Sequence, residues 1–183
     1  MKRSLAAVLI LLVSAAARAG TPAVLDLKDV SPLRDWFQAN GGSVRMIALL
    51  SPSCLSCVRG FETVQKTLIG VGDLRLRAAV VWIAVMPPDK RDMAVSLSAQ
   101  FTDGRLTYFW DPYRAAGETW QPPLKLKGAA WDVYLLYGAS ATWNEPDLDP
   151  GPPIFWMHQL KDLPQAPALD QKKLEQKIRA LLE

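Results

Sequence analysis

The sequence predicts a three-layer α/β domain, in which helices cover both faces of a central mixed sheet. Two near-continuous apolar runs, at residues 44–50 and 78–85, are typical of strands that are buried on both faces. Segments with the apolar spacing of helices separate these runs, and a third short strand is expected at 106–110. Two more strand-like runs, 132–137 and 154–160, then pair antiparallel before a final helix.

Capping residues and apolar spacing place the first helices. An alternating stretch at 24–30 predicts a short edge strand, and Ser31 followed by Pro32 predicts a helix start that is capped by the serine hydroxyl. A second helix is expected to run from the cysteines to about residue 69. Gly60 is a weak point within it, because glycine disfavours the helical backbone.

Aspartates mark the starts of three later helices. The spacing predicts a helix over 89–101, which would begin at an aspartate. Asp111 is expected to cap a short helix that ends at Trp120, and Asp170 is expected to cap the final helix. The final helix has an apolar stripe of the kind that packs on a sheet. Its members are Leu174, Ile178, Leu181 and Leu182.

The amino-terminal segment is predicted to be a signal peptide that occupies residues 1–19. It begins with Lys2 and Arg3, continues as an uncharged apolar stretch, and ends in the small-residue pattern Ala-Arg-Ala. Its removal would leave residues 20–183 as a single domain, which is exported to the periplasm or secreted. The alternative is an uncleaved leader that anchors the chain in a membrane.

Charge and missing motifs exclude several function classes. The chain has 21 basic and 18 acidic residues, but three of the basic residues lie in the predicted leader, so the rest is balanced and predicts no nucleic-acid partner. There is no glycine-rich phosphate loop and no serine-hydrolase motif, so no cofactor is expected. Glu145, Asp147 and Asp149 lack a complete calcium-loop pattern and are interpreted as a solvated acidic turn.

The two cysteines of the chain, Cys54 and Cys57, form a C-x-x-C between a buried strand and a helix. If the helix begins near Cys54, the sulfurs lie one turn apart on the same face, within disulfide reach. The free N–H groups at the helix start favour a thiolate at Cys54, the form that attacks disulfides or binds metals. These residues alone are compatible with a redox dithiol, a metal site or a structural pair.

The order of strand, C-x-x-C and helix resembles the thioredoxin superfamily, in particular its exported thiol–disulfide oxidoreductases. The resemblance covers most of the chain after the first twenty residues and rests on the motif and the order of the elements. It implies a three-layer thioredoxin-like fold with Cys54 as the attacking thiol and Cys57 as the resolving thiol. It also implies that the partners are protein thiols or disulfides.

Two features of that family are missing around the motif. The position of its usual cis-proline falls near residues 128–131, which hold no proline, so Trp131 is either an aromatic wall beside the sulfurs or a core residue. The strand before the cysteines holds no acid, and Glu62, the nearest carboxylate downstream, is expected to face solvent. The direction of the redox reaction therefore stays open.

His158, the only histidine, carries an alternative function. Exported copper-delivery members of the superfamily use two cysteines and a later histidine, so Cys54, Cys57 and His158 are a candidate Cu(I) site. Those proteins have C-x-x-x-C, however, and a strand spacing of about 4.8 Å places His158 on the order of 10 Å from the sulfurs. The other interpretations are a strand histidine with satisfied hydrogen bonds and a non-catalytic binding domain with a structural disulfide.

Overall fold

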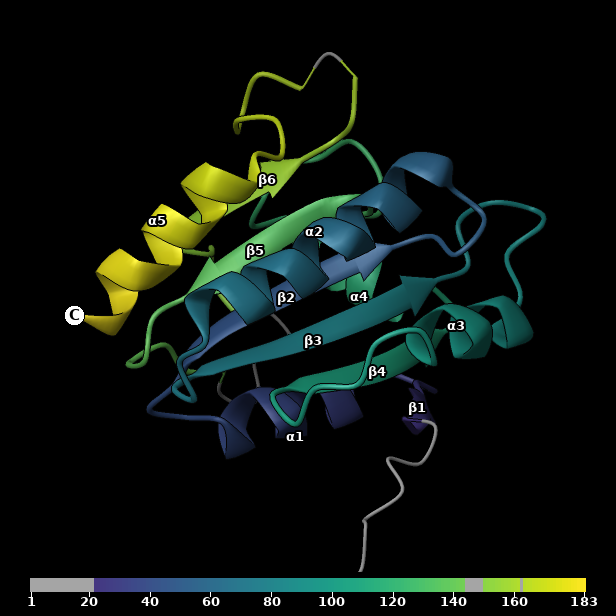
Figure 1. Ribbon diagram of the computed structural model, residues 1–183. Coiled ribbons are helices and arrows are strands. Elements are labelled where there is room, and N and C mark those ends of the chain that lie inside the picture. Colours follow the sequence, from purple (N-terminus) through teal and green to yellow (C-terminus); the bar gives the residue numbers. More distant parts are fainter. Residues whose placement is uncertain (1–21, 144–149, 162) are drawn as a thin grey trace, which may run out of the picture.

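A computed structural model describes residues 22–143, 150–161 and 163–183 of the chain. The predicted signal peptide (1–19) and the predicted acidic turn of Glu145, Asp147 and Asp149 lie outside the described residues. The described chain forms a six-stranded sheet with the strand order β1-β4-β3-β2-β5-β6, and Figure 1 shows helices in front of and behind it.

The sheet is mixed, as predicted. Four strands run parallel to one another: β1 (Val24–Asp26), β4 (Leu106–Asp111), β3 (Leu76–Ile83) and β2 (Val44–Leu50). Strand β5 (Val133–Tyr137) pairs antiparallel with β2, and β6 (Phe155–His158) pairs antiparallel with β5. Every residue of β2 is buried, because helices cover it from both sides.

Two separate hydrophobic cores make the three layers. On one face the sheet packs against α2 (Leu55–Val71), α3 (Arg91–Ser98) and α5 (Gln171–Leu182). On the other face it packs against α1 (Ser31–Ala39) and α4 (Ala115–Trp120). Successive side chains of β2 point to opposite faces, so Met46 and Ala48 enter the first core while Ile47 and Leu49 enter the second. The predicted fold class is confirmed.

The helix starts correct three predictions and confirm one. Ser31 is the first residue of α1 and not its cap, because the Asp29 carboxylate accepts the Ser31 N–H at 2.8 Å. Helix α3 begins at Arg91, after the predicted start, because Asp89 holds loop amides instead. Asp170 caps α5 as predicted and accepts the Lys173 N–H at 2.9 Å.

Asp111 was predicted to cap a helix directly, but it is the last residue of β4 and does not directly precede a helix. Its buried carboxylate accepts the N–H groups of Ala115 and Ala116, at 3.1 and 2.8 Å, across the intervening turn. The aspartate therefore holds the first turn of α4 from a position four residues before that helix. Burial raises the pKa of Asp111, and the backbone N–H groups oppose that rise.

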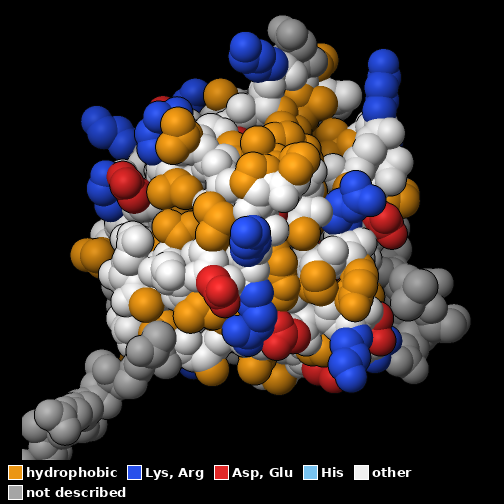
Figure 2. All heavy atoms as spheres, turned by 90° about the vertical axis from the view of Figure 1, so that its right-hand side faces the viewer, with side chains coloured by type: hydrophobic (Ala, Val, Ile, Leu, Met, Phe, Trp, Pro, Cys, Tyr) orange, Lys and Arg blue, Asp and Glu red, His pale blue; other side chains and the backbone are white. Residues whose placement is uncertain are grey.

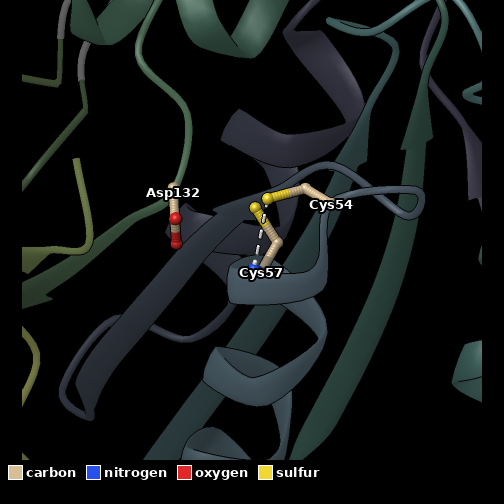
Figure 3. A group of neighbouring side chains, drawn as sticks. All are labelled: Cys54, Cys57 and Asp132. Atoms are coloured by element: carbon tan, nitrogen blue, oxygen red, sulfur yellow. Dashed lines mark hydrogen bonds between the residues drawn. The ribbon is translucent and has the colours of Figure 1, made fainter. Parts of the chain in front are cut away.

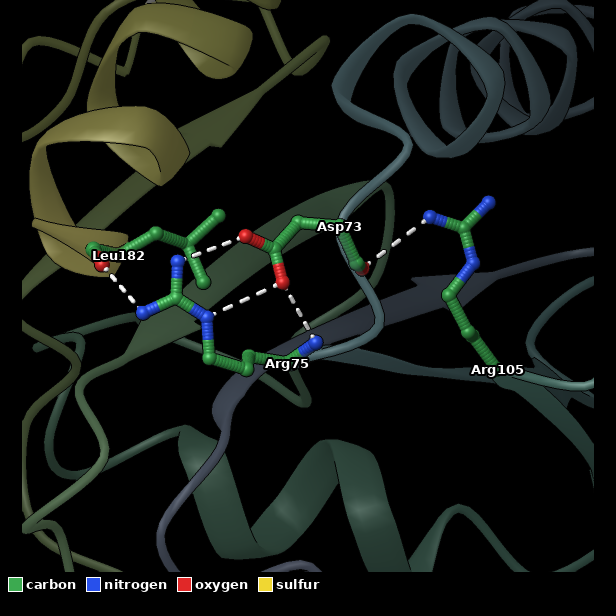
Figure 4. Close-up of polar contacts among 4 residues, drawn as sticks. All are labelled: Asp73, Arg75, Arg105 and Leu182. Carbon is green, nitrogen blue, oxygen red and sulfur yellow. Dashed lines mark hydrogen bonds and ion pairs between the residues drawn. The ribbon is translucent and has the colours of Figure 1, made fainter.

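Arg75 and Arg105 form a cluster of polar contacts with Asp73 and Leu182 (Figure 4). The cluster lies at the end of the sheet that is opposite to the cysteines. Arg75 forms a two-bond ion pair with Asp73 and also donates to the Leu182 carbonyl at 2.8 Å. Arg105 donates to the backbone carbonyl of Asp73 at 3.3 Å. Hydrogen bonds from Arg75 hold the pKa of Asp73 down at about 2. These contacts tie the loop after α2, the start of β4 and the end of α5 together.

Among the described residues, none of the helices is long and apolar enough to cross a lipid bilayer.

Candidate functional site

The C-x-x-C lies where β2 ends and α2 begins. Cys54 is the N-cap residue of α2, with an extended backbone, and its Sγ accepts the Cys57 N–H at 3.4 Å (Figure 3). Cys57 lies one turn into the helix and is fully buried, whereas Cys54 is half-buried. Both cysteines are free thiols. The first turn of the helix thus directs a backbone N–H at the Cys54 sulfur.

The turn before Cys54 is held by the Asp89 carboxylate. Asp89 accepts the hydroxyls of Ser51 and Ser53, at 2.8 and 2.6 Å, and also the Ser53 N–H. Its other oxygen accepts the N–H groups of Val85 and Met86. This one side chain therefore fixes the loops after β2 and β3 relative to each other, and so fixes where Cys54 sits.

Asp132, the residue directly before β5, lies beside the two sulfurs (Figure 3). Val133 pairs with Leu49 near the end of β2, so Asp132 lies beside the end of the strand that leads to the cysteines. A carboxylate oxygen of Asp132 and both sulfurs lie within 4.8 Å of one another. Asp132 is 1% exposed and has a left-handed backbone, with φ of 51°, a conformation that is uncommon for residues other than glycine.

Three side chains hold the Asp132 carboxylate. The Ser56 hydroxyl donates to Oδ2 at 2.9 Å, while the Tyr134 hydroxyl and the Gln159 amide donate to Oδ1 at 3.2 and 3.0 Å. Ser56 Oγ also lies 2.9 Å from Cys54 Sγ. A continuous hydrogen-bonded chain therefore runs from the Cys54 sulfur through Ser56 to Asp132.

The surroundings of Cys57 oppose the loss of its proton. Burial raises the pKa of the Cys57 thiol well above its ordinary range, and the negative charge of Asp132 raises it further. Burial likewise raises the pKa of Tyr134, so its phenol stays protonated and donates to Asp132. The two cysteines thus differ: the Cys54 sulfur is half-buried at a helix start, whereas the Cys57 thiol is fully buried beside a carboxylate.

Two solved structures share this architecture. A putative thioredoxin from Neisseria meningitidis superposes with a TM-score of 0.52 at 18% identity, over 78% of this chain and 77% of that one. A thioredoxin-like protein in its oxidised form gives a TM-score of 0.51 at 17% identity, over 78% and 79% of the two chains. The protein has a thioredoxin-like fold. No protein-family profile matches its sequence, and no protein of curated function does.

His158 does not join the sulfurs in this thioredoxin-like fold. Its Nε2 lies 2.9 Å from the Ala166 carbonyl oxygen, and its Nδ1 accepts the Leu160 N–H at 3.0 Å. Both ring nitrogens are therefore used by the backbone. The interpretation of His158 as a strand histidine with satisfied hydrogen bonds is confirmed, and the structure does not group it with Cys54 and Cys57 as the alternative copper site would need.

Asp132 follows directly after residues 128–131, where the cis-proline of the thioredoxin pattern was expected. It places a carboxylate beside the cysteines, whereas the strand before the cysteines holds no acid. Glu62 is exposed, as predicted, and Trp131 is a partly buried residue that packs on the core. Asp132 was not predicted as a site residue, because only a proline was expected here, although an acid as the first residue of the strand predicted at 132–137 was a visible signal.

Cys54, Cys57 and Asp132 are also the one cluster of potential metal ligands that the structure contains within its described ranges. Two thiolates and a carboxylate suit a borderline ion such as Zn²⁺. The Asp132 oxygens are already engaged by three donors, however, and the positive end of the α2 dipole disfavours a cation at this place. The geometry fits a hydrogen-bonded carboxylate better than a metal ligand.

Proposed function

We propose that the protein is an exported thiol–disulfide oxidoreductase that works through Cys54 and Cys57. The observation that carries the proposal is the asymmetry of the pair: Cys54 is half-buried at the start of α2, and Cys57 is sealed one turn behind it. Reactive cysteines are accessible and are often found at helix N-termini, and Cys54 is only half-buried and is the N-cap residue of α2.

The exchange takes two steps. The Cys54 thiolate attacks one sulfur of a partner disulfide, so that a mixed disulfide forms and the other partner sulfur leaves with the electron pair of the broken bond. Cys57 then loses its proton and attacks Cys54 Sγ, which releases the first partner sulfur as a thiol. The partner is reduced by two electrons and the protein is left with a disulfide; the opposite direction uses the same steps in reverse.

Partner proteins are the proposed substrates, because the surface around Cys54 is apolar. Leu55, directly after Cys54, is 75% exposed, and Met86 in the neighbouring loop is 37% exposed. Figure 2, which shows the face at which β2 and β3 end, has hydrophobic side chains gathered in its upper part with Lys and Arg among them. Apolar side chains that gather in one part of a surface, unlike single exposed ones, are typical of sites at which proteins bind.

The proposal predicts that Cys57→Ser accumulates mixed disulfides with partner proteins, because the second step is blocked. Cys54→Ser is the matched control and should trap nothing. The measurement is non-reducing electrophoresis of the tagged variants from their native host, followed by mass spectrometry. The absence of any mixed disulfide in Cys57→Ser would refute the exchange reaction.

The mass spectra also identify the first residue of the mature protein. This residue should be Gly20 if the leader is removed on export.

A further inference from the structure

The contact between Ser56 and Asp132 has a fixed direction. A serine hydroxyl has one hydrogen, and a carboxylate can only accept. The 2.9 Å bond from Ser56 Oγ to Asp132 Oδ2 therefore uses the Ser56 hydrogen, so in the thiol form of Cys54 the 2.9 Å contact between Ser56 Oγ and Cys54 Sγ uses the thiol hydrogen. Once Cys54 is in a mixed disulfide it has no hydrogen, and Ser56 is then free to pass a proton toward the bound sulfurs.

Resolution of a mixed disulfide needs a base next to Cys57. The thiol is fully buried, so no solvent reaches its sulfur to take the proton. A carboxylate oxygen of Asp132 lies within 4.8 Å of Cys57 Sγ, and no other carboxylate in the described ranges joins this cluster. Asp132 is held in place by Tyr134 and Gln159, so it is positioned before the reaction begins.

We propose that Asp132 accepts the proton of Cys57 during resolution and that Ser56 passes a proton on to the departing partner sulfur. The Cys57 S–H bond breaks and an O–H bond forms on Asp132, while the electron pair left on Cys57 makes the new bond to Cys54 Sγ. The bond between Cys54 and the partner breaks, and the partner sulfur keeps its electrons. Ser56 gives that sulfur its proton and takes one back from Asp132. After these transfers Ser56 and Asp132 carry the same protons as before the reaction.

The inference rests on the proposed function, and a purely electrostatic role of Asp132 predicts the opposite sign. If Asp132 were only a neighbouring negative charge, Asp132→Asn would lower the pKa of Cys57 and resolution would become faster. If Asp132 is the base, the same variant resolves on the order of 100-fold more slowly, at the lower end of general-base effects. The two roles are thus separated by the direction of one rate change.

Two different leaving groups distinguish the role of Ser56 from the role of Asp132. The Cys54 mixed disulfide is prepared either with glutathione, whose alkyl thiol needs a proton, or with thionitrobenzoate, an aromatic thiol that leaves as a stable thiolate. Release by Cys57 is followed in a single turnover by stopped flow or acid quench. Asp132→Asn should slow both releases. Ser56→Ala should slow the release of glutathione about 10-fold and leave that of thionitrobenzoate unchanged.

Thr63→Ala is the matched control, because the Thr63 hydroxyl donates to the Arg59 carbonyl within α2 and contacts neither Asp132 nor a sulfur. It should release both groups at the wild-type rate. The rate at which Cys54 first reacts with each reagent shows that a variant is folded. Wild-type or faster resolution in Asp132→Asn, or unchanged glutathione release in Ser56→Ala, would overturn the relay. Failure of the wild type to form any Cys54 mixed disulfide would instead refute the proposed function.

Discussion

Replacing Arg45 by methionine is expected to lower the free energy of unfolding by about 3 kcal/mol. Arg45 is 1% exposed, and its guanidinium donates to the carbonyls of Phe37, Gly138 and Ala141 at 2.7 to 2.9 Å. It also lies 4.0 Å from the centre of the Phe37 ring. Methionine fills much of the same volume but removes the guanidinium donor from all three carbonyls, although that of Gly138 keeps a backbone donor, the Ala141 N–H. Desolvation lowers the pKa of Arg45, which shows that its burial has a cost and limits the net effect.

Chemical denaturation of the purified variant measures this effect. Arg77→Met is the matched control, because Arg77 pairs with Arg45 in the β2–β3 register but is only partly buried. We expect the control to lose less than about 1 kcal/mol. Since Arg45 lies at the end of β2 that is opposite to Cys54, Arg45→Met should keep the wild-type reactivity of Cys54 while it is folded. Equal stability of Arg45→Met and the wild type would contradict this assignment.

Gly60 of α2 lies against Tyr134 and Gln159, the two side chains that donate to Asp132 Oδ1. A Cβ at this position would overlap the Tyr134 hydroxyl and would lie 2.6 Å from Gln159 Nε2 and 2.7 Å from Tyr134 Cζ. Gly60→Ala gains helix propensity of about 1 kcal/mol, but the forced shift costs more, so we expect a net loss of about 2 kcal/mol. Tyr134 and Gln159 must move, and both hold Asp132. The variant should therefore also resolve mixed disulfides more slowly.

Gly70→Ala is the control from the same helix. An added Cβ there meets the carboxylate of Glu175 at 3.0 Å, which is the far end of a flexible side chain. We expect this variant to be as stable as the wild type or slightly more stable, with an unchanged rate of resolution. Thermal unfolding and the single-turnover release of glutathione measure both variants. If Gly60→Ala behaves like Gly70→Ala, the close approach of Tyr134 to α2 is not needed for the site.

The architecture was predictable because its signals are local. The apolar run of β2 is typical of a strand that is buried on both faces, and its predicted bounds, residues 44–50, match the structure. Helix starts were less predictable, because Asp29, Asp89 and Asp111 bond to amides across turns and not as simple caps. A sequence pattern cannot show which amide an aspartate will reach.

The site was only half predictable, for a different reason. Cys54 and Cys57 are neighbours in the sequence, so their proximity follows from the helix. Asp132 is far along the chain and reaches the sulfurs only because β5 pairs with β2 in one register. His158 was a chemically attractive ligand, but the same sheet turns its ring to the backbone of its own segment. Both outcomes depend on strand pairing, which composition does not reveal.

The difference in reactivity between Cys54 and Cys57 is the most direct test of this account. The reduced wild-type protein is treated with iodoacetamide, and the two cysteines are followed separately by peptide mass spectrometry. We predict that Cys54 is alkylated at least about 100-fold faster than Cys57, because one sulfur is accessible at a helix start and the other is buried beside a carboxylate. Equal rates, or faster alkylation of Cys57, would contradict the roles given to the two thiols.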